Sequence, residues 1–373
     1  MSAPLPIDPA DLEWMARALA LAQGAIGLSD PNPRVGCVIV CADGHAEGYT
    51  QAAGDAHAEI MALRAAQAAG LRLAGASAYV TLEPCAHHGR TGPCCEALIA
   101  AGVARVVVAI ADPNPQVAGG GIARLRAAGI AVEVGPMATE ARELNIGFFS
   151  RMLRQRPWVR MKVAASLDGR TALANGDSQW ITQEPARRDG HAWRKRAGAV
   201  LTGVGTVLAD DPRLDVRWVE TALQPLRVVV DSRLQTPASA RVLQAPGAAL
   251  IVSAGADAQA QKAWRERGVE LLDLPGPSGK VDLAALMNAL AARGINEVHV
   301  EAGAKLNASL LREGLVDELL VYLAPKLIGP GQGMAELAPL ACLDQALPLE
   351  FGPVCAIGTD LRLLARLPGR DRF

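Results

Sequence analysis

The chain has 373 residues, 50% of them hydrophobic and 20% charged, so it is long enough for two or three domains with substantial cores and is not disordered as a whole. Its 37 basic and 38 acidic side chains leave a net charge of −1, and only 3% of its residues are aromatic, which disfavours nucleic acid or an anionic membrane as a partner. There is no membrane-spanning apolar stretch and no signal-peptide pattern, and seven cysteines are too few for a disulfide framework, so we expect a cytoplasmic protein.

The first part of the chain alternates helical and strand patterns. Asp8-Pro9, with Asp11 in the first turn, predicts the start of a helix over 8–26. The apolar run at 35–42 predicts a buried strand that ends at the turn Asp43-Gly44. The patterns that follow predict helices over 57–69 and 93–102, and strands over 76–82, 103–110 and 132–134. This alternation favours α/β layers.

A second α/β series follows a basic, polar segment at 151–157 that ends in Pro157. We therefore expect one domain over 1–150 and another over 151–373. The second series predicts strands over 158–166, 198–202, 226–231, 249–253, 296–301 and 317–324, and helices over 183–197, 282–293 and 304–312. The tetrapeptide Asp-Pro-Asn-Pro occurs at 30–33 and again at 112–115, with unlike flanks, and we interpret the two copies as independent loops.

One histidine and two cysteines have the pattern of a zinc site. His57 opens a helix within His57-Ala-Glu59, and Cys85 and Cys94, with eight residues between them, each follow a proline. Imidazole and thiolates are ligands that zinc prefers, and three of them leave a fourth position for water, whose pKa zinc lowers to about 7. Glu59 would then move protons without binding the metal, as in zinc deaminases.

Nearby residues offer alternatives to these ligands. Cys95 adjoins Cys94, but Cys94 lies at the predicted start of the helix and is our preferred ligand. His87 and His88 compete as ligands, although we expect them to line the pocket.

His-Ala-Glu also occurs at 45–47, and a closed structural zinc site is another use of such ligands. The copy at 45–47 follows a turn, so we expect His45 to be exposed in a hairpin. A closed structural zinc site is the alternative to catalysis, and the presence of Glu59 argues against it. The cysteines at 37, 41, 342 and 355 are expected to pack as small apolar side chains.

The first half of the chain resembles the cytidine-deaminase superfamily in two motifs, His57-Ala-Glu59 and Pro84-Cys85 followed by Cys94. The stretches at 30–37, 81–95 and 111–119 look like the bifunctional riboflavin-biosynthesis deaminase–reductases, and this resemblance covers nearly the whole chain, with Gly92 where that family commonly has Pro. It implies an α/β fold with an N-terminal cytidine-deaminase-like three-layer domain and a C-terminal dihydrofolate-reductase-like domain. It also makes Asn32 a candidate contact to a pyrimidine, the alternative being a turn residue.

For the second half, the resemblance rests on motifs at 162–171, 178–182, 203–214, 230–232 and 300–309. It implies a reductase that uses NADPH, held by Ala164, Trp180, Thr206, Asp210, Ser232, Gly303, Ala304, Lys305, Leu306, Asn307, Ala308 and Ser309. It implies substrate contacts from Ser178, Arg194, Leu214, Arg217 and Glu301, and Lys162 lies beside this set. The strand–glycine–helix junction at 300–309 suits phosphate, whereas Gly203-Val-Gly205 lacks the third glycine of a Rossmann fingerprint. Asp210 is a candidate general acid.

Two arginines could supply the local positive charge that a net charge of −1 does not. Arg194 and Arg217 can each bind phosphate through a forked pair of hydrogen bonds, so we expect them to clamp a sugar phosphate together. The alternative is that both are solvated surface residues.

The sequence thus suggests a two-step enzyme with zinc and NADPH as cofactors and a small pyrimidine ribosyl phosphate as substrate. By the resemblance, the first domain would deaminate 2,5-diamino-6-ribosylamino-4(3H)-pyrimidinone 5′-phosphate hydrolytically, and the second would reduce the ribosyl group to ribityl. The alternatives are a nucleic-acid base deaminase with a binding tail and a non-catalytic structural zinc protein. The strand over 317–324 is either a face for a homo-oligomer through the reductase domain or ordinary core.

Overall fold

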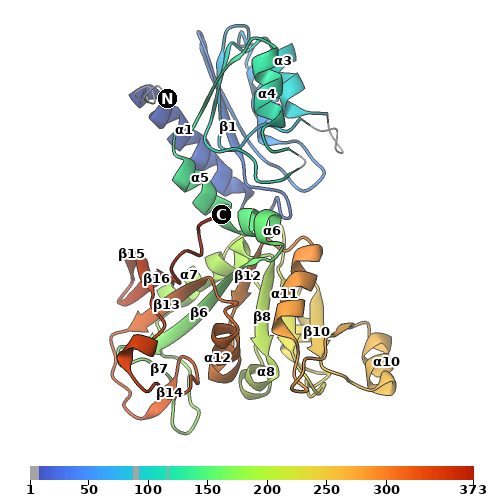
Figure 1. Cartoon of the computed structure of the whole chain (residues 1–373), viewed down its shortest axis with the longest axis vertical. Helices are drawn as coiled ribbons and strands as arrows, with labels where there is room; N and C mark the ends of the chain where they lie inside the picture. The colour runs from blue at the N-terminus through green and yellow to red at the C-terminus, as the bar shows by residue number, and fades with distance from the viewer. Residues whose placement is uncertain (1–7, 87–91, 116) are drawn as a thin grey trace. The chain divides into compact units, whose positions relative to one another are not determined.

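The structure, a computed structural model, describes residues 8–86, 92–115 and 117–373. Its chain forms two compact units, Met1–Arg154 and Gln155–Phe373 (Figure 1). The basic segment that suggested a boundary near residue 150 is helical as far as Arg154, because α6 (Ile146–Arg154) buries Phe148 and Phe149 in the core of the N-terminal unit. The division therefore falls four residues later in the chain than we expected, at 154 rather than 150.

The N-terminal unit is built around a five-stranded sheet in the order β2-β1-β3-β4-β5. β1 (Gly36–Cys41) pairs antiparallel with β2 (Gly44–Tyr49) and β3 (Ser77–Val80), whereas β4 (Arg105–Val108) and β5 (Ala131–Val134) continue the sheet in parallel. Alternate residues of each strand face opposite sides. One side packs against α2 (Ala58–Ala68), α3 (Cys94–Ala100), α4 (Gly120–Ala127) and α6, the other against α1 (Pro9–Ala22) and α5 (Ala138–Leu144). The predicted three-layer arrangement is confirmed.

A nine-stranded sheet forms the centre of the C-terminal unit, in the order β11-β10-β9-β8-β12-β6-β13-β16-β15. Its parallel part contains the six predicted strands and one more: β6 (Trp158–Ser166), β8 (Ala199–Gly203), β9 (Leu226–Val230), β10 (Ala249–Ser253), β11 (Glu270–Asp273), β12 (Glu297–Val300) and β13 (Glu318–Ala324). An antiparallel pair, β16 (Asp360–Arg366) and β15 (Glu350–Ile357), completes one edge, and β7 (Arg170–Leu173) pairs separately with β14 (Gly331–Gly333). β7, β11 and β14–β16 were not predicted.

The connecting helices of this unit are α7 (Glu184–Arg196), α8 (Val204–Asp210), α9 (Arg241–Gln244), α10 (Ala258–Glu266), α11 (Leu283–Ala292) and α12 (Ala304–Arg312). α11 and α12 cover an apolar face of the sheet. The opposite face of β6 carries Arg160, which is buried between Glu297 at 2.7 Å and Glu318 at 2.5 Å and lies over the ring of Trp193 from α7. Alternation along β6 thus separates an apolar layer from a charged one.

Burial decides whether the predicted strand over 317–324 is core or an exposed face. β13 lies between β6 and β16, and Leu320 and Tyr322 are 0% and 1% exposed, so the segment 317–324 is core and not a free oligomer face. All seven cysteines are free thiols. Within the described ranges, the helices are all too short or too polar to cross a membrane.

Candidate functional site

A cluster of three metal-ligating side chains lies at one end of the sheet of the N-terminal unit. The ligand atoms of His57, Cys85 and Cys94 all lie within 4.8 Å of one another. His57 Nδ1 is 3.7 Å from Cys85 Sγ and 3.3 Å from Cys94 Sγ. Tetrahedral zinc with its usual bond lengths separates such ligand atoms by about 3.5 Å, so the set fits zinc in both donor type and spacing.

Two helix starts position this cluster. His57 is the N-cap of α2, and Glu59 follows in the first turn, where it is only 4% exposed. Cys94 is the first residue of α3, and its backbone N–H donates to Cys85 Sγ at 3.3 Å. Cys95 is buried in the apolar core instead, and His87 and His88 lie outside the described residues.

The surroundings tune these groups for proton transfer and metal binding. Burial raises the pKa of Glu59 to about 7, which lets this carboxyl both accept and release a proton near neutral pH. The hydrogen bond from the Cys94 thiol lowers the pKa of Cys85 to about 4, so Cys85 is the thiolate that metal binding requires. The same pairing raises the pKa of Cys94.

A pocket of about 530 Å³ opens over Glu59, His57 and Cys85. Two separate loops that carry the Asp-Pro-Asn-Pro sequence both line it: Asn32 comes from the first copy, and Asp112 and Asn114 come from the second. Each copy follows an element of the same unit, and the fold brings the two together. The volume is in the range of small-molecule sites.

Asp112 and Arg151 are pocket residues that sequence reasoning missed. Burial raises the pKa of Asp112 to about 6, and its Oδ1 accepts a hydrogen bond from the backbone N–H of Asn114 at 2.7 Å. Arg151, from α6, lies over the ring of Phe148 and donates to the carbonyl of Pro31 at 3.0 Å. The repeated tetrapeptide could have indicated Asp112, whereas nothing near Arg151 in the sequence indicated that α6 reaches the pocket.

In the C-terminal unit, the predicted cofactor residues gather at the carboxyl ends of neighbouring parallel strands. The turns after β8 and β12 approach each other: a Cβ at Gly303 would lie 3.7 Å from Thr206 Oγ1. Gly303 caps α12, which leaves the amides of Ala304, Lys305 and Leu306 pointing out of the first turn. This edge of a parallel sheet is where ligands bind in α/β proteins.

The last three predicted residues of this segment already make contacts within the protein. The Asn307 amide donates to the carbonyl of Gly303 at 3.1 Å, and its side chain is buried and donates to the carbonyl of Met334. Ala308 is 1% exposed, and Ser309 Oγ donates to the carbonyl of Lys305 within the helix. The backbone N–H groups that remain available for a phosphate are those of the first turn, and the cofactor contacts of these three residues stay a prediction.

The other predicted cofactor residues are more dispersed. Trp180 is 62% exposed and stacks with the Arg187 guanidinium at 4.5 Å. Asp210 ends α8 next to Gln179, and burial raises its pKa, which suits a group that can carry a proton. The remaining predicted contacts are Ala164 on β6, Ser178 in the loop before Trp180, and Ser232, whose Oγ accepts from the backbone N–H of Val281.

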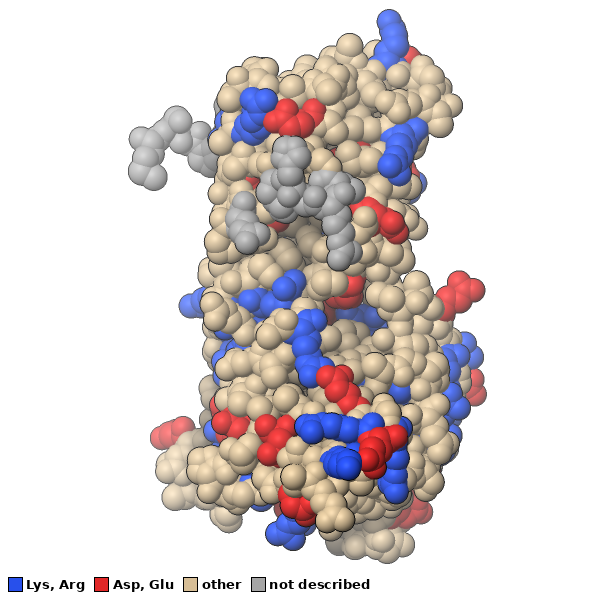
Figure 2. All heavy atoms as spheres, turned by 90° about the vertical axis from the view of Figure 1, so that its right-hand side faces the viewer, with Lys and Arg blue, Asp and Glu red and all other residues tan. Residues whose placement is uncertain are grey.

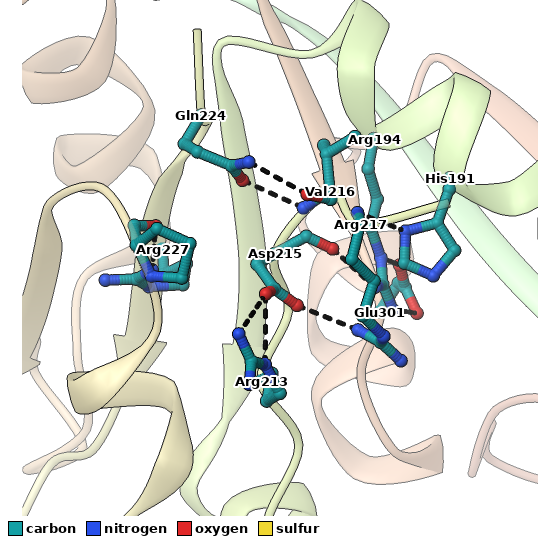
Figure 3. A network of polar contacts seen from close by, with 10 residues as sticks. His191, Arg194, Arg213, Asp215, Val216, Arg217, Gln224, Arg227 and Glu301 are labelled. Atoms are coloured by element: carbon teal, nitrogen blue, oxygen red, sulfur yellow. Dashed lines mark hydrogen bonds and ion pairs between the residues drawn. The ribbon is translucent and has the colours of Figure 1, made fainter. Parts of the chain in front are cut away.

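Glu301 is the centre of the predicted substrate site. Its carboxylate receives Arg194 Nε at 2.5 Å and Nη2 at 2.9 Å, and Lys162 Nζ lies 3.7 Å away (Figure 3). Burial alone would raise the pKa of Glu301, but Arg194 and Lys162 hold it well below its usual range, so the group stays anionic. Arg194 also donates to the carbonyl of Asp215.

The expected phosphate clamp by Arg194 and Arg217 stays a prediction. In this structure the Nε and Nη2 atoms of Arg194 donate to Glu301 and its Nη1 donates to the carbonyl of Asp215. Arg217 instead shares the buried carboxylate of Asp215 with Arg213, on either side of it (Figure 3). Among contacts between described residues, the guanidinium of Arg217 uses only Nη1 for a hydrogen bond, at 2.8 Å, and its side chain is 40% exposed.

The neighbours of Arg217 fix its backbone. Its N–H donates to Nδ1 of His191, whose pKa is lowered to about 4 by burial and by the nearby arginines, so this histidine is a neutral acceptor at pH 7. The side chain of Leu214 is 2% exposed in the core, so the predicted substrate contact of this residue would come from its backbone. Sequence reasoning missed Asp215 and Arg213.

Comparisons with known proteins agree with this geometry. Residues 9–110 match the family described as the cytidine and deoxycytidylate deaminase zinc-binding region, and residues 157–363 match the RibD C-terminal domain. The riboflavin biosynthesis protein RibD of Escherichia coli is 48% identical over 95% of this chain and 98% of its own length.

Two solved structures resemble the whole chain. One, of Acinetobacter baumannii RibD, is 42% identical and has a TM-score of 0.87 over 95% of this chain and 98% of its own. Another, from Thermotoga maritima, is described as a diaminohydroxyphosphoribosylaminopyrimidine deaminase/5-amino-6-(5-phosphoribosylamino)uracil reductase. It is 31% identical, with a TM-score of 0.85 over 96% of this chain and 98% of its own.

Proposed function

Because the chain belongs to the RibD family of riboflavin-biosynthesis proteins, we propose that its two units, Met1–Arg154 and Gln155–Phe373, are the two catalytic domains of one enzyme. The protein is a bifunctional deaminase and reductase that uses zinc and NADPH. The substrate that we propose is 2,5-diamino-6-ribosylamino-4(3H)-pyrimidinone 5′-phosphate, consistent with the activity described for the Thermotoga maritima relative. The carrying observation is the pocket lined by buried Glu59 and by His57 and Cys85, two members of the metal-binding cluster that Cys94 completes.

In the deamination, His57, Cys85 and Cys94 hold zinc, which supplies Lewis-acid activation of water when bound. Glu59 takes one proton from the attacking water and delivers it to the ring nitrogen, and it then moves the second proton of that water to the leaving amino group, which departs as ammonia; a pKa of about 7 is suitable for both transfers. Asn32, Asp112 and Asn114 lie where they can hydrogen-bond the pyrimidine edge.

In the reduction, NADPH would be held by the first turn of α12, by Thr206 and by Trp180. The anionic Glu301 lies beside Lys162 on the side of the substrate. Glu301 accepts hydrogen bonds from ribosyl hydroxyls, and Arg217 binds the 5′-phosphate. When bound, NADPH would supply the hydride that reduces C1′ of the ribosyl group, and Asp210 is our candidate for the donor of the accompanying proton.

The whole proposal is tested by incubating the purified protein with this substrate and NADPH. We expect ammonia release and NADPH oxidation in sequence. Absence of ammonia release and of NADPH oxidation, in protein shown to contain zinc, would refute it. Gel-shift with single-stranded RNA tests the base-deaminase alternative, for which we expect no complex.

Replacing Arg217 with Lys should raise the reductase KM for the phosphorylated substrate by about 10-fold or more, because Lys keeps the charge but loses the forked geometry. The KM for the dephosphorylated substrate should not change. Steady-state kinetics with both substrates measure this, with the exposed Arg265→Lys as the matched control. Equal effects on both substrates would exclude a phosphate contact.

We also propose that the protein acts on a small molecule in the cytoplasm and that it forms a homo-oligomer through its reductase domain. Free cysteines suit a reducing compartment, and basic and acidic side chains are interspersed on the face drawn in Figure 2. β15 is the last strand of the sheet, and its Phe351 and Val354 are 75% and 54% exposed. An apolar sheet edge of this kind is typical of a subunit interface.

The oligomer proposal predicts that Phe351→Glu yields a smaller species than the wild type in sedimentation velocity. A carboxylate desolvated at the interface would oppose association. The matched control is Leu12→Glu, at an exposed apolar residue of α1 in the N-terminal unit. If Phe351→Glu leaves the sedimentation coefficient unchanged, β15 does not form the interface.

A further inference from the structure

Glu83 is a buried carboxylate between the metal-binding segment and the second Asp-Pro-Asn-Pro loop. It is 3% exposed and lies two residues before Cys85. Its Oε2 accepts hydrogen bonds from the backbone N–H groups of Asp112 at 3.2 Å and Gly119 at 3.0 Å, and its Oε1 accepts from Ile122 at 3.1 Å. One side chain thus holds both ends of the loop.

The loop that Glu83 holds lines the pocket. Asp112, Asn114 and Val117 are pocket residues, and all three lie between the outer anchor points of Glu83. α4 starts directly after this loop, and its cap, Gly119, has no side chain to satisfy the N–H groups of the first turn. Glu83, which is distant in the sequence, accepts the hydrogen bonds that a capping side chain would accept. Its negative charge is also favourable at the N-terminus of a helix.

A close backbone contact locks the same junction. A Cβ at Gly121 would lie 1.8 Å from the carbonyl oxygen of Pro84, so the start of α4 packs directly against the Pro84-Cys85 segment. Gly119 has a left-handed φ of 77°. The loop therefore moves only with the metal-binding segment as long as Glu83 holds it.

We propose that Glu83 is a positioning residue of the deaminase, which sets Asp112 and Asn114 at the distance from the metal cluster that the pyrimidine requires. Glu83 itself lines the pocket, but it acts through the loop because both of its carboxylate oxygens already accept hydrogen bonds from three backbone N–H groups. A carboxylate is needed, since the NH2 group of a glutamine would face at least one N–H and leave it without an acceptor. This inference rests on the proposed deaminase function.

The test is Glu83→Gln in the full-length protein, assayed for both activities. We expect the deaminase KM to rise about 10- to 100-fold, as for one or two lost buried hydrogen bonds, with a smaller change in kcat. The zinc content and the reductase rate should match the wild type. An unchanged KM, or loss of kcat and zinc together, would overturn a positioning role.

A second variant keeps the inference testable if Glu83→Gln does not fold. Gly119→Ala strains the left-handed cap whose N–H Glu83 holds, and Gly129→Ala introduces the same strain beyond the other end of α4, with open space at both sites. Only Gly119→Ala should raise the deaminase KM; equal values for the two variants would contradict the proposal. Wild-type protein without deaminase activity would instead refute the proposed function.

Discussion

Replacing Glu59 with Gln should lower the rate of deamination by about 10²- to 10⁴-fold and leave the rate of NADPH-dependent reduction unchanged. The amide keeps the size of the side chain, but it cannot take up a proton. Because Glu59 is not among the three clustered ligands, bound zinc should remain at the wild-type level. Ammonia release, NADPH oxidation on the pre-deaminated substrate and metal analysis measure the three quantities separately.

The control for this variant is Glu13→Gln, an exposed glutamate on α1 of the same unit. It should behave as the wild type in all three measurements. Retained ammonia release in Glu59→Gln would remove this residue from proton transfer. Loss of zinc together with activity would show instead that Glu59 supports the metal cluster.

Replacing Arg160 with Met should destabilise the C-terminal unit by about 3–5 kcal/mol, because it leaves buried carboxylates without their central partner. Glu297 and Glu318, both 1% exposed, bond Arg160 from the two flanking strands. Burial opposes the charge of Arg160, but these two carboxylates outweigh it and raise its pKa. Arg196 and Arg366 also contact them and cannot replace a cation at the centre of the sheet.

Tryptophan fluorescence during denaturation measures this effect, since five of the six tryptophans lie in the C-terminal unit. The matched control is Arg188→Met, which removes an exposed partner of Glu184 on α7 and should change stability by less than about 1 kcal/mol. Deaminase activity should survive in native Arg160→Met. A variant as stable as the wild type would show that the buried charges contribute no net stability.

The fold was predictable where local pattern and tertiary position agree. The parallel strands of the C-terminal unit are buried on both faces, so they appear as apolar runs, and all six predicted ones are present. β15 and β16 escaped prediction because they are the antiparallel edge, where exposed and buried residues follow no simple alternation and β15 contains an irregularity in its register. β7 and β14 are short and pair only with each other.

For the site, local spacing indicated the chemistry of the metal cluster. His57, Cys85 and Cys94 could be selected because each belongs to a short motif, His57 and Cys94 at helix starts and Cys85 after Pro84, and because zinc restricts the donor types. The arginines could not be assigned in this way. Whether Arg194 meets a phosphate or Glu301 depends on the packing of α7 over β12, which no local pattern contains.

The sequence by itself therefore determined the α/β class, the metal-binding residue types and the resemblance to a deaminase joined to a reductase. Only the tertiary structure decided that the two Asp-Pro-Asn-Pro loops share one pocket, that Asp215 rather than a phosphate holds Arg213 beside Arg217, and that the segment 317–324 is core. The physical reason is the separation along the chain over which each interaction acts. Turns, caps and ligand spacing act over a few residues, whereas ion pairs and pocket walls join residues far apart in the chain.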